Sequence, residues 1–326
     1  MLLQTVPNDI FRRFIPTPLH LDFSIMGRQM RLETNSAMVR SHVRSISERY
    51  GDVEQQSPDV LWRIVSDPSS GLRPPLSRRI GFSDGGLRFI NFNQRSFLAV
   101  DIDDHEAISF LSEELCEDEM GFYSPILSDL FDLSSAALGL TEIMAGCVAL
   151  DGRGLLIFGS PRSGKTTACY WAGKMGMEFH GDQVTCIEMI SGKPKAWGQF
   201  WPAAFRPETL EYLPEIESVT RPLRYRDLTL LCLDNRSFLP SEAYSVVPVA
   251  CVCLDRCAAD SPALESIDKD ELFSLLLSSL PFVENRRFNY QRREVVRTLA
   301  ELPAYHLAYP ADPRFAAELF PTLLNG

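Results

Sequence analysis

The stretch GLLIFGSPRSGKTTACYWAGKMG, residues 154–176, decides the fold of this chain. Residues 155–158 form a short apolar run bounded by glycines, too short for a helix, and therefore predict a buried strand. Residues 167–174 have helix-forming side chains and are followed by Gly176, which predicts a helix with a glycine at its C-terminal end. The sequence thus predicts a strand, a loop and a helix in direct succession.

The loop of this stretch is a full match to the pattern G-x-x-x-x-G-K-[ST], formed by Gly159, Ser160, Pro161, Arg162, Ser163, Gly164, Lys165 and Thr166. Glycines at these positions let main-chain N–H groups converge on phosphate oxygens at the positive end of the following helix. Lys165 is expected to reach the outer phosphates and the Thr166 hydroxyl to bind Mg²⁺. We therefore expect ATP to bind at these residues and at Thr167, with Mg²⁺ as cofactor.

The composition of the 326-residue chain is typical of a soluble globular protein, with 45% hydrophobic and 23% charged residues. No apolar run is long enough to span a bilayer, and the N-terminus lacks the basic start and apolar core of a signal peptide. We therefore expect a cytoplasmic protein without a membrane partner. Among the eight cysteines, Cys251, Cys253 and Cys257 come closest to a metal pattern, but free thiols are the favoured interpretation.

The net charge of −11 argues against nucleic acid as a partner, because phosphate contacts need a clustered positive field. One basic cluster occurs near the C-terminus and comprises Arg286, Arg287, Arg292, Arg293 and Arg297. Its pattern favours a solvated helix face, with an anion-binding role as the alternative.

The chain length favours two domains. Residues 1–124 are predicted to form an α+β domain with an accessory or substrate-recognition role. Its predicted elements are a hairpin at 20–34, a helix at 36–51, and strands at 60–67, 87–93 and 95–102. No metal-ligand spacing or nucleophile pattern occurs in this part of the sequence.

Residues 125–326 are predicted to form the nucleotide-binding domain. A strand at 143–151 turns through residues 152–154 into the strand before the loop, so that a hairpin leads into the loop. The other predicted elements are a helix at 125–138, a broken strand at 177–189, strands at 228–235 and 246–256, and a largely helical C-terminal part. The strands at 228–235 and 246–256 contain Asp234 and Asp255 near their ends. Each aspartate is a candidate magnesium ligand or simply the first residue of a turn.

Residues 143–183 resemble the C-terminal domain of HPr kinase/phosphorylase and of the HPr-kinase-related proteins. In that family a hairpin leads into the phosphate loop, and an acidic pair follows the loop lysine at a fixed interval; here the pair falls on Asp182 and Gln183. The segments GQFWPAAFRPETL, which contains Arg206, and VVRTLAELPAYHLAYPADPRFAAELF are similar to later segments of the related proteins. The resemblance covers roughly residues 135–326. It implies a mixed-sheet α/β P-loop kinase domain, a fold shared with ATP-dependent phosphoenolpyruvate carboxykinase.

This resemblance implies transfer of the γ-phosphoryl group of ATP to a hydroxyl, most often of a serine, on a protein, peptide or small-molecule acceptor. Asp182 would take the proton from the attacking hydroxyl, while Lys165 and Mg²⁺ would neutralise charge on the phosphates. Thr166 and Gln183 would contact the metal, and Arg206 the substrate. A homo-oligomer is also implied. From the residues alone, Asp182 could equally be a turn residue, and its interval from Lys165 favours the catalytic role.

The sequence departs from the family pattern at three places. Gln183 replaces the second acid and supplies no charge to a metal, and Met144 stands where the family has a histidine and cannot relay a proton. Pro161 and Arg162 replace small loop residues, and Arg162 could cover the phosphates or point to solvent. Phosphorylase activity is therefore not expected.

Three functions stay open on this evidence. The first is an ATP-dependent kinase, and the second is a nucleotide-binding scaffold or sensor without catalysis. The third is a P-loop ATPase, which requires an acid at the end of a strand beside the loop, a place that Asp234 or Asp255 could fill. These two residues and Glu188 are also candidates for a metal contact that compensates for Gln183.

Overall fold

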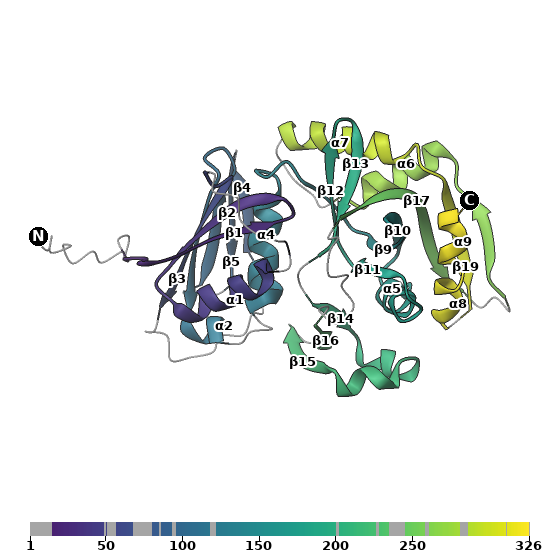
Figure 1. The fold of residues 1–326 in the computed structure, drawn as a ribbon, viewed down its shortest axis with the longest axis horizontal. Coiled ribbons are helices and arrows are strands. Elements are labelled where there is room, and N and C mark those ends of the chain that lie inside the picture. Colours follow the sequence, from purple (N-terminus) through teal and green to yellow (C-terminus); the bar gives the residue numbers. More distant parts are fainter. Residues whose placement is uncertain are drawn as a thin grey trace, which may run out of the picture. The chain divides into compact units, whose positions relative to one another are not determined.

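The computed structural model describes residues 15–48, 50, 57–67, 80–84, 86–92, 96–117, 122–199, 202–225, 228–234, 245–257, 261–280, 286–310 and 312–325. The chain divides into two compact units, Met1–Phe122 and Tyr123–Gly326 (Figure 1). None of the helices in the described ranges combines the length and the apolar composition needed to cross a bilayer. The recognition and nucleotide-binding roles assigned to the two parts of the sequence stay predictions.

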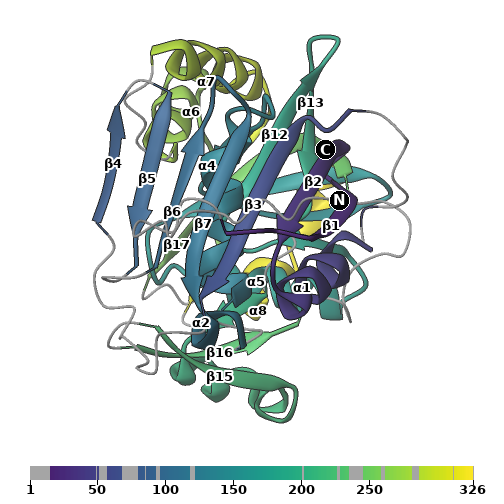
Figure 2. The same cartoon turned by 90° about the vertical axis from the view of Figure 1, so that its left-hand side faces the viewer.

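The first unit is built on a seven-stranded mixed sheet in the order β1-β2-β3-β7-β6-β5-β4, whose strands lie side by side in Figure 2. Its elements are β1 (Leu19–Ile25), β2 (Arg28–Thr34), α1 (Ala37–Ser47), β3 (Val60–Asp67), β4 (Ile80–Asp84), β5 (Leu87–Asn91), β6 (Phe97–Asp101), β7 (Glu106–Ser112) and α2 (Glu113–Glu117). The β2–β3 and β3–β7 pairs are parallel, and the other pairs are antiparallel. Strands β4 and β7 were not predicted from the sequence.

Local sequence explains the first elements of this unit. Met26 and Gly27 have φ values of 50° and 72°, and this left-handed pair makes the two-residue turn that joins β1 to β2. The side chain of Ser36 accepts a hydrogen bond from the main-chain N–H of Val39 and thereby caps α1. Helix α1 ends at Ser47, earlier than predicted, and the predicted stop at Gly51 lies outside the described residues.

The second unit contains most of the chain's regular structure and all of the predicted nucleotide site. Its elements are η1 (Phe122–Leu127, beginning at the last residue of the first unit), α4 (Ser128–Ser135), β8 (Thr141–Ile143), β9 (Gly146–Leu150), β10 (Arg153–Gly159), α5 (Lys165–Lys174), β11 (Glu178–Gly181), β12 (Thr185–Ile190), β13 (Lys193–Trp197), β14 (Ala203–Phe205), η2 (Pro207–Glu211), η3 (Pro214–Ser218), β15 (Thr220–Tyr225), β16 (Leu228–Leu233), β17 (Ser245–Arg256), β18 (Ala263–Ser266), α6 (Lys269–Ser278), α7 (Arg286–Leu299), β19 (Ala304–Tyr309), α8 (Arg314–Ala317) and α9 (Phe320–Asn325).

The central sheet of this unit has nine strands. Seven follow the order β11-β9-β10-β17-β13-β12-β8, while β19 pairs with β17 and β18 pairs with β19. Strand β17 pairs in parallel with β10 and with β19, and the other pairs are antiparallel. A separate antiparallel sheet has the order β14-β16-β15. The predicted α/β class is therefore confirmed at the level of mixed sheets combined with helices.

Helices cover both faces of the nine-stranded sheet. Successive side chains of a strand point to opposite faces, so an apolar run such as that of β10 presents apolar side chains on both. Leu155 and Ile157 of β10 pack with residues of α5, α8 and α9 on one face. Leu156 and Phe158 of the same strand pack with residues of α6 and α7 on the other face (Figure 1). The apolar run before the loop is consequently buried on both sides, as a short run without alternation predicts.

The predicted hairpin leads into the loop as expected. Strands β9 and β10 pair antiparallel through a turn at Asp151 and Gly152, whose φ values are 52° and 74°. The predicted strand at 143–151 is in fact two short strands, β8 and β9, and the largely helical C-terminal part that was predicted ends in two short helices, α8 and α9. The break expected in the strand at 177–189 is present between β11 and β12.

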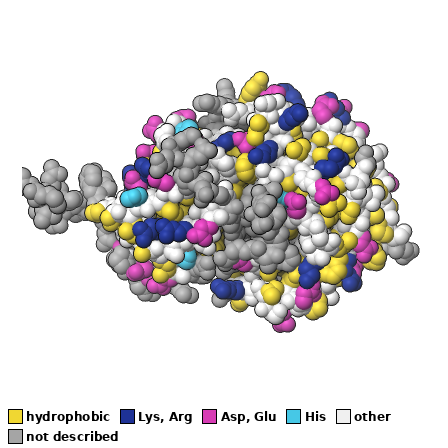
Figure 3. Space-filling view, viewed as in Figure 1, with side chains coloured by type: hydrophobic (Ala, Val, Ile, Leu, Met, Phe, Trp, Pro, Cys, Tyr) yellow, Lys and Arg dark blue, Asp and Glu magenta, His cyan; other side chains and the backbone are white. Residues whose placement is uncertain are grey.

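Basic and acidic side chains lie interspersed on the face shown in Figure 3.

Candidate functional site

The loop at residues 159–164 joins the end of β10 to the start of α5. Gly159, Arg162 and Gly164 have φ values of 147°, 73° and 85°, and the main-chain N–H of Ser163 donates to the carbonyl of Ser160 at 3.1 Å. Helix α5 begins at Lys165 and continues for 10 residues. The predicted strand, loop and helix therefore occur in order, with glycine at two of the three left-handed positions.

Lys165 folds back over the loop that precedes it. Its Nζ donates to the carbonyl oxygen of Gly159 at 2.7 Å and to that of Ser160 at 3.1 Å. Burial lowers the pKa of the Lys165 ammonium, and the nearby negative charge of Asp182 is among the groups that oppose the shift. The ammonium thus lies at the mouth of the loop, where a phosphate oxygen could replace the two carbonyls as its partner.

Asp182 lies in the turn between β11 and β12 and is completely buried. Burial raises the pKa of its carboxyl, and the nearby side chains of Thr166, Gln199 and Gln183 oppose the rise. Oδ1 accepts a hydrogen bond from Nε2 of Gln199 at 2.9 Å. Among the described residues, Oδ2 has no hydrogen-bond partner. The structure therefore brings Asp182 beside Thr166 and leaves one carboxylate oxygen available.

A second buried polar atom without a partner lies in the loop itself. Ser163 is 3% exposed, and within the described part of the chain its Oγ makes no hydrogen bond. Such buried atoms are rare in native proteins, and an ion or ligand that the structure does not include is one explanation. The hydroxyl of Thr166 is an oxygen ligand that fits Mg²⁺, and the loop's own N–H groups fit phosphate oxygens. No group of three or more His, Cys, Asp or Glu in the described ranges could hold a metal by itself.

A cavity of about 980 Å³ lies over this loop, entirely within the second unit. The predicted site residues that line it are Gly159, Ser160, Pro161, Arg162, Gly164, Lys165, Thr166, Thr167, Gln183 and Arg206. Ser163 and Asp182 do not line it, because both are buried behind the surface. A hydroxyl in the cavity therefore contacts Asp182 only after a local rearrangement of the site.

Among the described residues that line the cavity, four side chains are basic and one is acidic, Glu208. The basic ones are Arg162, Lys165, Arg206 and Arg256. This excess of positive charge contrasts with the net charge of −11 on the whole chain. The cavity is consequently suited to a polyanionic ligand.

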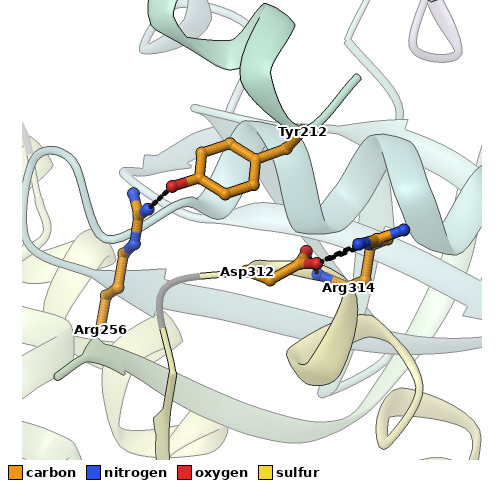
Figure 4. A network of polar contacts seen from close by, with 4 residues as sticks. All are labelled: Tyr212, Arg256, Asp312 and Arg314. Carbon is orange, nitrogen blue, oxygen red and sulfur yellow. Dashed lines mark hydrogen bonds and ion pairs between the residues drawn. The ribbon is translucent and has the colours of Figure 1, made fainter. Parts of the chain in front are cut away.

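Tyr212 and Arg256 form one wall of the cavity from separate elements. Nη2 of Arg256, at the end of β17, donates to the hydroxyl of Tyr212 at 2.6 Å, and its guanidinium lies 5.1 Å from the ring centroid (Figure 4). Nearby, Nε of Arg314 donates to Asp312 at 2.7 Å, and the Arg314 guanidinium lies 5.6 Å from the ring of Trp171 in α5. The start of α8 is in this way held against the helix that follows the loop.

Tyr309, the last residue of β19, forms a hydrogen bond with the loop. Its buried hydroxyl donates to the carbonyl of Ser163. Burial raises the pKa of this hydroxyl, which therefore keeps its proton and stays a donor. This contact was not predicted from the sequence, and neither were the roles of Gln199, Tyr212 and Arg256. The only available signal for Arg256 was its place directly after Asp255, at the end of an apolar strand.

Several residues singled out from the sequence lie away from the cavity. Asp234 follows β16, which belongs to the three-stranded sheet, and Glu188 accepts a hydrogen bond from Nε1 of Trp197 at 2.9 Å. Asp255 lies on β17 directly beside β10, one residue beyond the partner of Gly159, but it does not line the cavity. Met144 lines the cavity and is 49% exposed.

Two other expectations concerned cysteines and arginines. All eight cysteines are free thiols, and seven of them are buried. The interpretation of the arginine cluster as a solvated face is wrong for Arg292, which is 3% exposed and interacts electrostatically with Glu142. Arg293 and Arg297 are exposed.

The fold and site together define an α/β unit with a glycine loop and a cation-rich cavity at the end of a buried strand. No family model matches the chain, and no curated protein matches it. Among solved structures, the chain is similar to the Hpr(Ser) kinase/phosphatase from Coxiella burnetii. The sequence identity is 11% and the TM-score 0.30, over 56% of this chain and 93% of that chain. A TM-score of this size carries no argument about function.

Proposed function

We propose that this protein is an ATP-dependent kinase that transfers the γ-phosphoryl group to a hydroxyl, such as that of a serine, on a protein, peptide or small-molecule acceptor. The observation that carries the proposal is the arrangement around the loop. Lys165 and Thr166 line a cation-rich cavity, and the buried carboxyl of Asp182, whose Oδ2 has no hydrogen-bond partner among the described residues, lies near Thr166. An anionic nucleotide, a metal and a base are the components that phosphoryl transfer requires.

Each residue has a distinct part in the proposed reaction. The N–H groups of the loop and the ammonium of Lys165 bind and orient the phosphates. Thr166 holds Mg²⁺, which when bound neutralises phosphate charge, and Gln183 faces the same space as a neutral ligand. Asp182 accepts the proton of the acceptor hydroxyl at Oδ2, and its raised pKa suits a base better than an ordinary carboxylate would. Arg206 and Arg256 are available to the acceptor or to the nucleotide.

Nucleotide binding is tested first, with the purified protein and Mg·ATP in a calorimeter. Lys165→Ala removes the charge at the mouth of the loop and is expected to weaken binding at least about 100-fold, the scale of a charged hydrogen bond lost to a phosphate. Lys174→Ala is the matched control, because Lys174 is exposed at the other end of the same helix. Equal affinity of Lys165→Ala and wild type would refute the site.

Phosphoryl transfer is tested with γ-labelled ATP and a cell lysate as the source of acceptors. Asp182→Asn should label acceptors at least about 100-fold more slowly than wild type, the scale of a general base. Asp151→Asn, in the exposed turn of the β9–β10 hairpin, should label them at the wild-type rate. If wild type binds ATP but neither labels acceptors nor releases phosphate, the protein is a nucleotide-binding scaffold instead.

An ATPase is the second candidate, and the position of Asp255 is the observation that favours it. This acid ends the strand next to β10, as such enzymes require. Asp255 does not line the cavity, however, and so the kinase is the better-supported function. Asp255→Asn separates the two, because only an ATPase that uses this acid would lose phosphate release.

A further inference from the structure

Gln199 is a buried side chain that contacts the turn carrying Asp182. It lies two residues after the end of β13 and is 1% exposed. Its main-chain N–H donates to the carbonyl of His180 at 2.7 Å. Its side chain contacts Asp182 twice: Oε1 accepts from the main-chain N–H of Asp182 at 3.1 Å, and Nε2 donates to Oδ1 at 2.9 Å.

The chemistry of these two contacts permits only one orientation of the Gln199 amide. A main-chain N–H can only donate and an ionised carboxylate can only accept. Rotating the amide by half a turn would set two donors against each other and two acceptors against each other. An ionised carboxylate or a hydrocarbon side chain could not satisfy both groups, whereas a primary amide does.

The neighbouring backbone is fitted to this side chain. A Cβ atom on Gly181 would lie 2.9 Å from Oε1 of Gln199 and 3.3 Å from the carbonyl oxygen of Val184. A Cβ atom on Gly146 would lie 3.3 Å from the carbonyl oxygens of both Gly181 and Asp182. The turn therefore has little room to shift, and the side chain of Gln199 fills the space that glycine at 181 leaves.

We propose that Gln199 is the positioning residue of Asp182, an inference that rests on the proposed function of the site. By holding Oδ1 and the main-chain N–H together, Gln199 fixes the rotation of the carboxylate and leaves Oδ2 as the reactive oxygen. Because Gln199 does not line the cavity, it acts on the acceptor only through Asp182. Its loss should slow phosphoryl transfer and leave nucleotide binding, which depends on the loop, unchanged.

The kinetic test uses Gln199→Met, which keeps the volume of the side chain and removes both hydrogen bonds. Transfer from Mg·ATP to water, measured as phosphate release, and to lysate acceptors should show a kcat about 10- to 100-fold lower, the cost of a misplaced catalytic group. The KM for ATP should stay within about two-fold of wild type, since the loop is untouched. The matched control is Trp197→Phe, which removes one buried side-chain hydrogen bond from the end of β13, two residues before Gln199, without touching Asp182.

A double variant separates positioning from a general loss of structure. Asp182→Asn combined with Gln199→Met should be no slower than Asp182→Asn alone, because Gln199 has no base left to position. A merely structural role of Gln199 would make the two losses multiply. Multiplied losses, or a wild-type kcat in Gln199→Met, would overturn the proposal while leaving the kinase function intact.

Hydrogen exchange tests the contact without any need for activity. In wild type the amide of Asp182 is buried and donates to Oε1 of Gln199, so its exchange should be slow. Gln199→Met should accelerate this exchange at least about 10-fold, whereas Trp197→Phe should not. Gln199→Glu keeps an acceptor for the amide but puts a carboxylate against Oδ1, so it should retain slow exchange and lose transfer. If wild type transfers no phosphoryl group, the proposed function fails and this measurement still decides whether Gln199 holds Asp182; equal exchange in wild type and Gln199→Met would show that it does not.

Discussion

The loop after β10 and the turn after β11 meet at the same site, but they are held in different ways. The loop depends on backbone conformation, with left-handed φ values at Gly159, Arg162 and Gly164. One buried hydroxyl, that of Tyr309, supports it through the carbonyl of Ser163. A side chain introduced into such a loop disturbs the direction of its N–H groups, and with them the affinity for phosphate.

The turn depends on a side chain from a distant part of the sequence. Asp182 takes its orientation from Gln199, 17 residues further along the chain. Its neighbour Gln183 is exposed on the cavity, whereas Asp182 is completely buried. The difference indicates that substitutions in the loop should change nucleotide affinity, while substitutions around the turn should change the rate of transfer at unchanged affinity.

Gly164→Ala should show the largest effect on the loop. The residue has a φ of 85°, and a Cβ atom would clash with the hydroxyl of Tyr309 and lie 3.3 Å from Cγ of Pro313. We expect the affinity for Mg·ATP to fall about 100-fold, since left-handed strain costs roughly 1–2 kcal/mol and the clash adds to it. Calorimetric titration measures this directly.

Gly176→Ala is the control for that variant, because Gly176 has a φ of 96° but nothing within 4 Å of the added Cβ. It should lower the free energy of unfolding by about 1 kcal/mol without weakening ATP binding. If both variants bind ATP equally well, the close approach of Tyr309 to the loop does not contribute to ATP binding.

Tyr309→Phe should have a smaller effect on the same loop. The variant keeps the ring and leaves the buried carbonyl of Ser163 without its hydroxyl donor. One hydrogen bond is worth about 1 kcal/mol net, so ATP affinity should fall about five-fold. Tyr305→Phe, on the same strand and only partly buried, should bind as wild type does. A loss of stability with no loss of affinity would confine Tyr309 to a structural role.

The loop could be predicted from sequence because its geometry is encoded locally. The glycines, the apolar run before them and the helix after them are contiguous, and each follows from backbone chemistry within a few residues. The β9–β10 hairpin was predicted for the same reason, from a tight turn between two apolar runs, although the turn was expected at residues 152–154 and lies at Asp151 and Gly152. Local patterns are sufficient when the residues that hold a feature are its neighbours in the chain.

The surroundings of Asp182 could not be predicted in this way. Its interval from Lys165 indicated a site residue, but its burial and the partnership with Gln199 arise only when β11, β12 and β13 come together. The same holds for Tyr212 and Arg256, which line one cavity from segments 44 residues apart. Sequence position likewise gave no sign that Asp234 would end a strand of a different sheet from the loop.

Gly181→Ala tests the turn by displacing Gln199 rather than removing it. The added Cβ would lie 2.9 Å from Oε1, a flexible side-chain end that can give way by a few tenths of an ångström. We expect phosphate release to slow about three-fold, less than for removal of Gln199, since the misplacement of Asp182 is smaller. ATP affinity should not change. In a Gln199→Met background the same substitution should have no further effect on the rate, and a three-fold loss there would mean that Gly181 acts independently of Gln199.

Asp182→Asn should raise the stability of the second unit by a small amount while it removes activity. Burial raises the pKa of Asp182 in the folded state, so at neutral pH the buried charge opposes folding. Asparagine keeps an oxygen for Nε2 of Gln199 and carries no charge. In buffer free of Mg²⁺ and nucleotide, the midpoint of thermal unfolding should rise about 2–4 °C, equivalent to roughly 1 kcal/mol for a unit of this size.

The raised pKa of Asp182 also determines how the stability difference between Asp182→Asn and wild type changes with pH. Between the ordinary aspartate pKa and the raised pKa of Asp182, the folded protein binds the extra proton, so wild-type stability falls as the pH rises through that window. The advantage of Asp182→Asn should therefore be full above the window and should disappear as the pH falls toward the ordinary aspartate value. Asp151→Asn, at an exposed position, should match wild type at every pH. If Asp182→Asn were less stable than wild type at neutral pH, the hydrogen bond from Gln199 would contribute more than burial of the charge costs. The charged carboxylate of Asp182 would then stabilise the turn.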